Sequence, residues 1–311
     1  MGEAQLSTLP TAAFFSWDNF INFKVIFLSI VLEAIPFVLV SVFVSAIIHN
    51  FVTETMIEKI ISRNKLFNIV PATLLGILMP VCDCGMVPIV RRLVKKGVPL
   101  HTAVSFMLAA PIINPVVIAA TFFTLRTNTN LVLFRLIAAF FIASFTGWLT
   151  SIFFKSNELK ATPHHHSCGC CDHDTDDFVI QPTFTEKIFR TIHDASNEFF
   201  EMGKYLIFGA TLRAFSQILI PRAHLLAVGQ HPILSIAVLM LFAFGISVCS
   251  SADAFIAASL TTSFLPDSLV AFMVFGPMLD FKNTLMLLHT FRLRFVIWLL
   301  VVVSTLSSMA A

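Results

Sequence analysis

Apolar runs long enough to cross a lipid bilayer recur along this chain from about Phe20 to its last residue. A helix of about 20 apolar residues spans the roughly 30 Å hydrocarbon core of a bilayer. Hydrophobic residues make up 57% of the 311 residues and charged residues only 12%, which is too little polar surface for a soluble protein of this length. The chain is therefore predicted to be an all-α polytopic membrane protein.

The apolar runs form eight segments, which one long polar stretch divides into two groups of four. The segments are 22–49, 67–98, 101–125, 131–154, 199–220, 232–264, 269–290 and 295–311. Three regions are therefore expected: an N-terminal membrane repeat over 1–154, a His/Cys/Asp-rich cytoplasmic loop over 155–186, and a C-terminal membrane repeat over 187–311.

The two groups of segments align with each other as an internal repeat. The aligned pairs share an offset of 166 to 168 residues: Cys82 with Cys249, Pro99 with Pro266, Pro111 with Pro277, Asn114 with Asp280, and Glu33 with Glu201. Rare residue types at one nearly constant offset are hard to obtain by chance. The pattern therefore predicts two four-segment repeats.

Two corresponding segments, 67–98 and 232–264, are too long to be simple spans. A continuous helix of about 33 residues would reach roughly 50 Å, well beyond the hydrocarbon core. The sequence VCDCG (81–85) interrupts the first segment, and VCSSAD (248–253) interrupts the second at the same repeat position. Each segment is either a tilted full span or a re-entrant pair of half-helices.

The distribution of basic residues favours the re-entrant arrangement. Re-entrant hairpins would gather most Lys and Arg residues on the face that carries the long loop, and leave Lys24, Arg126, Arg135 and Arg222 on the other. This bias would place the loop in the cytoplasm and both termini outside. Each half would then have three spans and one hairpin, so the repeats would be inverted and the hairpin tips would meet near the midplane.

The first interruption contains two thiols around a carboxylate and a glycine: Cys82, Asp83, Cys84 and Gly85. Backbone leaves a helix within a membrane only where it lines a cavity or packs in protein. Soft thiolates prefer Cu(I), Zn(II) and trivalent arsenic. The predicted solute ligands are therefore these residues together with Cys249, Ser250 and Asp253 of the second interruption. The alternative is that the cysteines are small buried apolar residues.

A second pair of breaks is expected at AAPIINP (109–115) and FGPMLDFKN (275–283). Polar groups in the middle of a membrane segment are costly and often functional. The predicted ligands here are Pro111, Asn114, Pro115, Pro277, Asp280, Lys282 and Asn283, with the prolines freeing backbone carbonyls. Asp280 and Lys282 are two residues apart and share no helical face unless the backbone unwinds. The alternative is a structural pair that braces the break.

Two further groups of residues complete the expected sites. Glu33 is an intramembrane carboxylate and Glu201 lies near the start of an expected helix, and both are candidates for carrying a coupling proton. The loop sequence HHHSCGCCDHDTDD (164–177) is typical of a flexible metal-binding segment, with His164, His165, His166, Cys168, Cys170, Cys171 and His173 as candidate ligands. It lacks the paired spacing of a zinc finger, so a solvated linker remains the alternative.

Several function classes are not expected for this sequence. The chain has no Walker lysine motif, Rossmann glycines, nucleophile elbow or HExxH motif, so an enzyme is not predicted. A net charge of +2 does not indicate a nucleic-acid partner. No cofactor is firmly indicated, and the one considered is a bound Zn or Cu ion.

The residues around the first two breaks resemble a known bacterial family. MPVCDCGMVPIVRRLVKKGVP followed by FMLAAPIINPVVIAATF is similar to the permease family that includes organoarsenical efflux permeases and the YraQ and YcgR proteins, most closely the YcgR-like branch. The second half resembles the family through GISVCSSADAF and FGPMLDFKNTLML. Cys82 and Cys84 match the family's cysteine motif, whereas other members carry Ser or Glu in place of Asp83.

The resemblance implies an eight-segment permease of the bacterial inner membrane. It implies efflux of trivalent organoarsenicals, copper or zinc among relatives, and for this branch a second small membrane subunit and a role in zinc homeostasis. The expected function is a secondary permease for a thiophilic metal or metalloid, with lipid as its surroundings. The alternatives are a non-transporting membrane subunit or metal sensor, and a permease for an organic anion.

Overall fold

The computed structural model describes residues 17–51, 65–77, 83–126, 129–154, 184–219, 232–261 and 264–310. Helices are the regular elements throughout these residues, which confirms the all-α class. The first half contains α2 (Trp17–Phe51), α4 (Lys65–Leu75), α5 (Asp83–Lys95), α6 (Leu100–Ala109), α7 (Pro115–Thr124) and α8 (Thr129–Phe153). The second half contains α9 (Phe184–Leu219), α11 (Pro232–Ile246), α12 (Ala252–Leu260), α13 (Pro266–Met278), α14 (Phe281–Thr290) and α15 (Leu293–Ala310).

Four stretches of the described residues are long and apolar enough to cross a membrane: Phe20–Ile47, Thr129–Phe153, Pro266–Thr290 and Leu293–Ala310. Shorter apolar helices, Leu100–Ala109, Pro115–Thr124 and Leu234–Ile246, lie between them. Exposed apolar side chains along α2, such as Val25, Leu28 and Leu32, suit contact with lipid. The chain is a multi-pass membrane protein.

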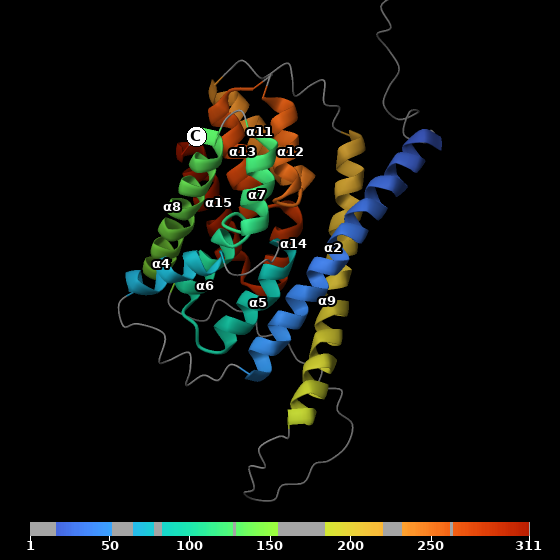
Figure 1. Cartoon of the computed structure of the whole chain (residues 1–311), viewed down its shortest axis with the longest axis vertical. Coiled ribbons are helices and arrows are strands. Elements are labelled where there is room, and N and C mark those ends of the chain that lie inside the picture. Colours follow the sequence, from blue (N-terminus) through green and yellow to red (C-terminus); the bar gives the residue numbers. More distant parts are fainter. Residues whose placement is uncertain are drawn as a thin grey trace, which may run out of the picture.

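The two overlong segments are both broken, so neither is a continuous tilted span. The first divides into α4 and α5, and we call the start of α5 at Asp83 the first tip. The second divides into α11 and α12, and we call residues 247–253 the second tip. Figure 1 shows α4 and α5 together in the lower part of the molecule and α11 and α12 together in the upper part. This placement agrees with re-entrant hairpins that enter from opposite sides.

The two other expected breaks are also present. Residues 110–114 separate α6 from α7, and residues 279–280 separate α13 from α14. The described helices therefore follow the same order in both halves of the chain, although the symmetry that relates the halves stays a prediction. The Trp17 end of α2 and the C-terminal end lie in the upper part of Figure 1, as expected if both ends are on one side.

Each hairpin packs against the broken helix of its own half. At Gly76, which follows α4, an added Cβ would lie 2.8 Å from Ala110 Cα in the break between α6 and α7. In the second half, Ser247 ends α11 with a left-handed φ of 49°, and its hydroxyl accepts a hydrogen bond from Phe281 N at 3.1 Å. The end of α4 and the second tip thus each lie beside the other break of their own half.

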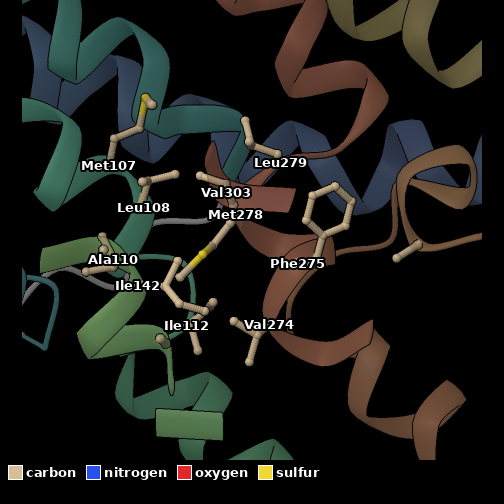
Figure 2. Packing of buried hydrophobic residues seen from close by; sticks show 14 of the residues in the cluster. Met107, Leu108, Ala110, Ile112, Ile142, Val274, Phe275, Met278, Leu279 and Val303 are labelled. Atoms are coloured by element: carbon tan, nitrogen blue, oxygen red, sulfur yellow. The ribbon is translucent and has the colours of Figure 1, made fainter. Parts of the chain in front are cut away.

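The apolar core lies where the two halves meet. Figure 2 shows Met107 and Leu108 of α6, Ile142 of α8, Met278 of α13 and Val303 of α15 converging on one cluster. Close approach of α6 and α8 depends on Gly147, because a Cβ there would lie 1.7 Å from Ser105 Oγ. The remaining two long helices, α2 and α9, pack on each other beside this core, with α2 also against α5 and α9 also against α14.

Candidate functional site

A buried lysine links the first tip to the break between α13 and α14. Lys282 Nζ lies 3.5 Å from Asp83 Oδ2 and 3.7 Å from Asp280 Oδ2. Asp83 and Asp280 are each 1% exposed and Lys282 is 6% exposed. Neither carboxylate oxygen of Asp83 has a hydrogen-bond partner among the described residues, so the ion pair with Lys282 is a contact between charges. The site thus holds two acids around one base.

The unwound backbone at Asp280 makes this arrangement geometrically available. Asp280 is extended, with φ −111° and ψ 170°, and its side chain accepts a hydrogen bond from Asn283 N to cap α14. Asp280 precedes α14, and Lys282 lies in the first turn of that helix. The Asp280 carboxylate can therefore approach the Lys282 ammonium, although the two residues are only two positions apart. Pro277 lies buried in the last turn of α13, just before the break. The expected condition for Asp280 and Lys282 to meet is therefore fulfilled.

Asn114 has the corresponding position in the first half. Its Oδ1 accepts a hydrogen bond from Val116 N at 3.0 Å and caps α7. Pro115 is the first residue of α7 and is exposed, whereas Pro111 is buried in the turn before it. The capping contacts of Asn114 and Asp280 support the structural alternative for part of their role.

An arginine from the first half holds the second tip. Arg135 of α8 donates to Asp253 Oδ2 at 2.9 Å, to the Ser250 carbonyl at 3.1 Å and to Thr121 Oγ1 of α7 at 2.8 Å. Arg135 is 1% exposed, so its side chain lies inside the protein, and its assignment to one side of the membrane stays a prediction. The carboxylate of Asp253 and the freed carbonyl at Ser250 give the guanidinium buried partners that a count of charges along the sequence cannot reveal.

The two tips are close enough to interact electrostatically. The Asp83 carboxylate of the first tip acts on both the Cys249 thiol and the Asp253 carboxylate of the second. Glu33 on α2 also acts on the Cys249 thiol. Cys249 is a free, half-buried cysteine whose Sγ lies 3.5 Å from Ser251 Oγ. These contacts agree with the expectation that the tips approach each other.

Several predicted ligands lie outside the described residues. They are Cys82, the side chain of Cys84, and all seven loop positions: His164, His165, His166, Cys168, Cys170, Cys171 and His173. Gly85 lies buried within α5 and Asn283 lies buried within α14. In the described part of the chain, no three His, Cys, Asp or Glu side chains are placed to hold a metal ion.

A cavity of about 610 Å³ lies between α11, α13 and α15. Its lining is mainly apolar and includes Met240, Phe244, Phe275 and Leu300. None of the predicted ligands lines it. The charged residues of the tips therefore do not form the wall of this cavity.

The two proton-coupling candidates have different surroundings. Glu33 is exposed on α2, whereas Glu201 on α9 contacts His289 of α14 and Arg91 of α5. The sequence reasoning missed Arg135 and His289 as functional candidates. A lone basic residue in an apolar run was the available signal for both.

Comparison with known proteins identifies relatives over most of the chain. The profile of the ArsP_1 family, described as "Predicted permease", matches residues 19–311. The chain is 42% identical over 285 residues to the UPF0718 protein YcgR of Bacillus subtilis, covering 91% of this chain and 93% of the relative. It is 38% identical over 274 residues to a putative two-component membrane permease complex subunit of Streptococcus mutans, covering 88% of each. No solved structure matches the chain.

Proposed function

Because the chain belongs to the ArsP_1 family of permeases, we propose that it moves a thiophilic metal or metalloid across the bacterial membrane as a secondary permease. The solute binds where the two hairpin tips approach the breaks at residues 110–114 and 279–280. Rocking of the two halves then exposes this site to each side in turn.

The charge of the buried tip residues is the observation that supports this proposal. Asp83, Asp253 and Asp280 supply three carboxylates, and Lys282 and Arg135 supply two positive charges, which gives a net charge of −1 when all five groups are ionised. An uncompensated buried charge is costly, so a positively charged solute is favoured at this place. Each basic residue already contacts a carboxylate, and for this reason an organic anion is the less suitable solute.

The cysteines give the proposed site its preference for soft solutes. Cys249 lies near Asp83, and Cys82 and Cys84 flank Asp83 in the sequence. Thiolates favour Zn(II), Cu(I) and trivalent arsenic over hard ions such as magnesium. Asp83 and Asp280 would neutralise the charge of the solute, and the carbonyls freed near Pro111 and Pro277 would complete its surroundings.

Transport by purified protein in lipid vesicles tests this function. We expect the Cys82→Ser/Cys84→Ser variant to lose flux of Zn(II), Cu(I) or trivalent arsenic by about ten-fold or more, since soft ligands dominate affinity. The matched control replaces three loop thiols, Cys168→Ser/Cys170→Ser/Cys171→Ser, and should retain basal flux. Unchanged flux in the first variant would contradict the proposal.

The Streptococcus mutans relative supports a second part of the proposal, because its name describes a subunit of a two-component complex. We infer that this chain acts with a second small membrane subunit, and that its loop collects metal on the cytoplasmic side. Deleting residues 161–177 separates the alternatives. A permease keeps basal flux without the loop, whereas a metal sensor loses its function.

A further inference from the structure

A second polar cluster lies at the far ends of the two helices that carry the Asp83–Lys282 ion pair. Arg91 is on α5, eight residues after Asp83, and His289 is on α14, seven residues after Lys282. At 1.5 Å per residue these positions lie about 12 Å and about 10 Å farther along their helices. The helices α5 and α14 also pack against each other. The cluster and the proposed solute site are therefore the two ends of one packed pair of helices.

Glu201 of α9 brings the ends of both helices together. Its Oε1 lies 2.9 Å from His289 Nε2 and 3.6 Å from Arg91 Nη1. The other imidazole nitrogen, His289 Nδ1, lies 2.7 Å from the hydroxyl of Tyr205, one turn along α9. Both nitrogens of His289 are thus engaged, one by a carboxylate and one by a hydroxyl.

This set of partners can accept or release one proton without moving its heavy atoms. In the neutral form, His289 Nε2–H donates to Glu201 and Nδ1 accepts from the Tyr205 hydroxyl. When His289 is protonated, Nδ1–H donates and the Tyr205 hydroxyl turns to act as acceptor. The side chains of Glu201 and His289 are 41% and 28% exposed, compared with 1% for Asp83, so the protein encloses them less than it encloses the first tip.

We propose that Glu201 and His289 bind the proton that is coupled to solute movement. This inference rests on the proposed permease function and concerns residues outside the proposed solute site. Protonation weakens the attraction of Glu201 for Arg91, which loosens α5 from α9. The change reaches the solute site because Asp83 begins α5 and Lys282 lies in the first turn of α14.

The charged groups around Glu201 are those of the cluster and of the helices packed against it. Arg91 from α5 and His289 from α14 are the charged groups that act on Glu201. The other elements packed against α9 and α14 are α2, α11 and α15. Their charged residues and histidines are Asp18, Lys24, Glu33 and His49 on α2 and Arg294 on α15, and α11 has none. On the cluster's own helices the others are Asp83, Arg92 and Lys95 on α5, Lys282 on α14, and Glu186, Lys187, Arg190, His193, Asp194, Glu198, Lys204 and Arg213 on α9.

Two assays on the same Zn(II)-loaded vesicles test the inference. One measures Zn(II) accumulation driven by an imposed pH gradient, together with proton movement reported by an internal pH dye. The other measures exchange of labelled for unlabelled Zn(II) without a gradient. We expect Glu201→Gln and His289→Gln to lose gradient-driven accumulation and proton movement by about ten-fold, yet to keep exchange within about two-fold of wild type.

The matched control is His193→Gln, because His193 is an exposed histidine on the same helix and bonds only to Asn197 in the described contacts. It should behave as wild type in both assays. Full gradient-driven accumulation in Glu201→Gln and His289→Gln would overturn the inference, as would equal loss of exchange, which would indicate a structural role. Wild-type protein that exchanges no Zn(II), Cu(I) or trivalent arsenic would instead overturn the proposed function and this inference with it.

Discussion

The two hairpin tips each present a buried aspartate to a basic residue of the opposite half, but the contacts differ. Asp83 of the first tip faces Lys282 at 3.5 Å, and the same ammonium lies 3.7 Å from Asp280. Asp253 of the second tip bonds Arg135 at 2.9 Å, and that guanidinium also bonds the Ser250 carbonyl and Thr121. The first tip is therefore held by the charge of the Lys282 ammonium, whereas the second tip is held by several hydrogen bonds from the Arg135 guanidinium.

This difference indicates which tip changes during transport. A planar guanidinium fixes several partners in one geometry, whereas an ammonium on a flexible stem does not. The second tip is therefore the anchored element, joined through Arg135 to both α7 and α8. In the proposed function, the first tip is the element that a positively charged solute would release, because the Asp83 carboxylate would exchange Lys282 for the solute.

The largest expected effect comes from breaking the anchored tip. Arg135→Met leaves Asp253 buried without its partner, and we expect it to lower the free energy of unfolding by about 3–5 kcal/mol. Thermal unfolding in detergent measures the change. The control Arg126→Met removes a surface arginine that lies over the Phe123 ring, and should change stability by less than about 0.5 kcal/mol. Equal melting temperatures for the two variants would show that Arg135 is no anchor.

Replacing Lys282, the basic residue at the first tip, should lower the free energy of unfolding less than Arg135→Met does, but should strongly reduce transport. Lys282→Met leaves two buried carboxylates without their base but removes no hydrogen bond from Asp83, so we expect a loss of about 3 kcal/mol, the lower end of the range for a broken buried ion pair. Solute flux should fall by about ten-fold or more, because the variant has no resident charge to return when the solute leaves. If Lys282→Met destabilises the protein as much as Arg135→Met, the contrast between the tips is wrong.

A smaller effect is expected from crowding Lys282 without changing its charge. A Cβ at Gly209 on α9 would lie 3.0 Å from Lys282 Cγ and 3.3 Å from its Cβ. Gly209→Ala should therefore displace the lysine and lower flux by about three-fold, with little change in melting temperature. Gly203→Ala on the same helix is the control, since a Cβ there has open space and should stabilise the helix by about 0.5–1 kcal/mol. Equal flux in both variants would count against a role for the position of Lys282.

The smallest expected effect separates capping from solute binding at Asn114. Asn114→Ala removes the cap of α7 and should cost about 1 kcal/mol of stability, measured by thermal unfolding. Asn114→Ser restores a capping oxygen and should restore stability. If flux recovers in Asn114→Ser as well, Asn114 acts mainly through the cap; if flux stays low, its amide contributes to the solute site.

The breaks could be predicted from the sequence because they have local causes. Proline, glycine and small polar residues that cluster in the middle of an apolar run favour a break in the helix, although a single proline such as Pro36 lies inside a continuous helix. The positions near Asp83, Asn114, Ser250 and Asp280 were found in this way. The same local signals could not separate capping from solute binding, because an N-cap and a ligand require the same side-chain oxygens.

The partners across helices could not be predicted, because they depend on tertiary packing. Arg135 and Asp253 are 118 residues apart, and Tyr205 and His289 are 84 apart. Counting charges assigns Arg135 to one side of the membrane but cannot show that its side chain is buried in the protein. If every basic residue within an apolar run is assumed to have a buried partner, Arg135 and His289 become candidates from the sequence.

X-ray absorption at the zinc edge tests the central claim most directly, because it reports which atoms surround the bound metal. The sample is the Zn(II)-loaded protein without residues 161–177, so that the loop ligands are absent. The account predicts sulfur neighbours at about 2.3 Å that disappear in the Cys82→Ser/Cys84→Ser variant. Zinc surrounded only by oxygen and nitrogen, or a spectrum unchanged by the two substitutions, would contradict it.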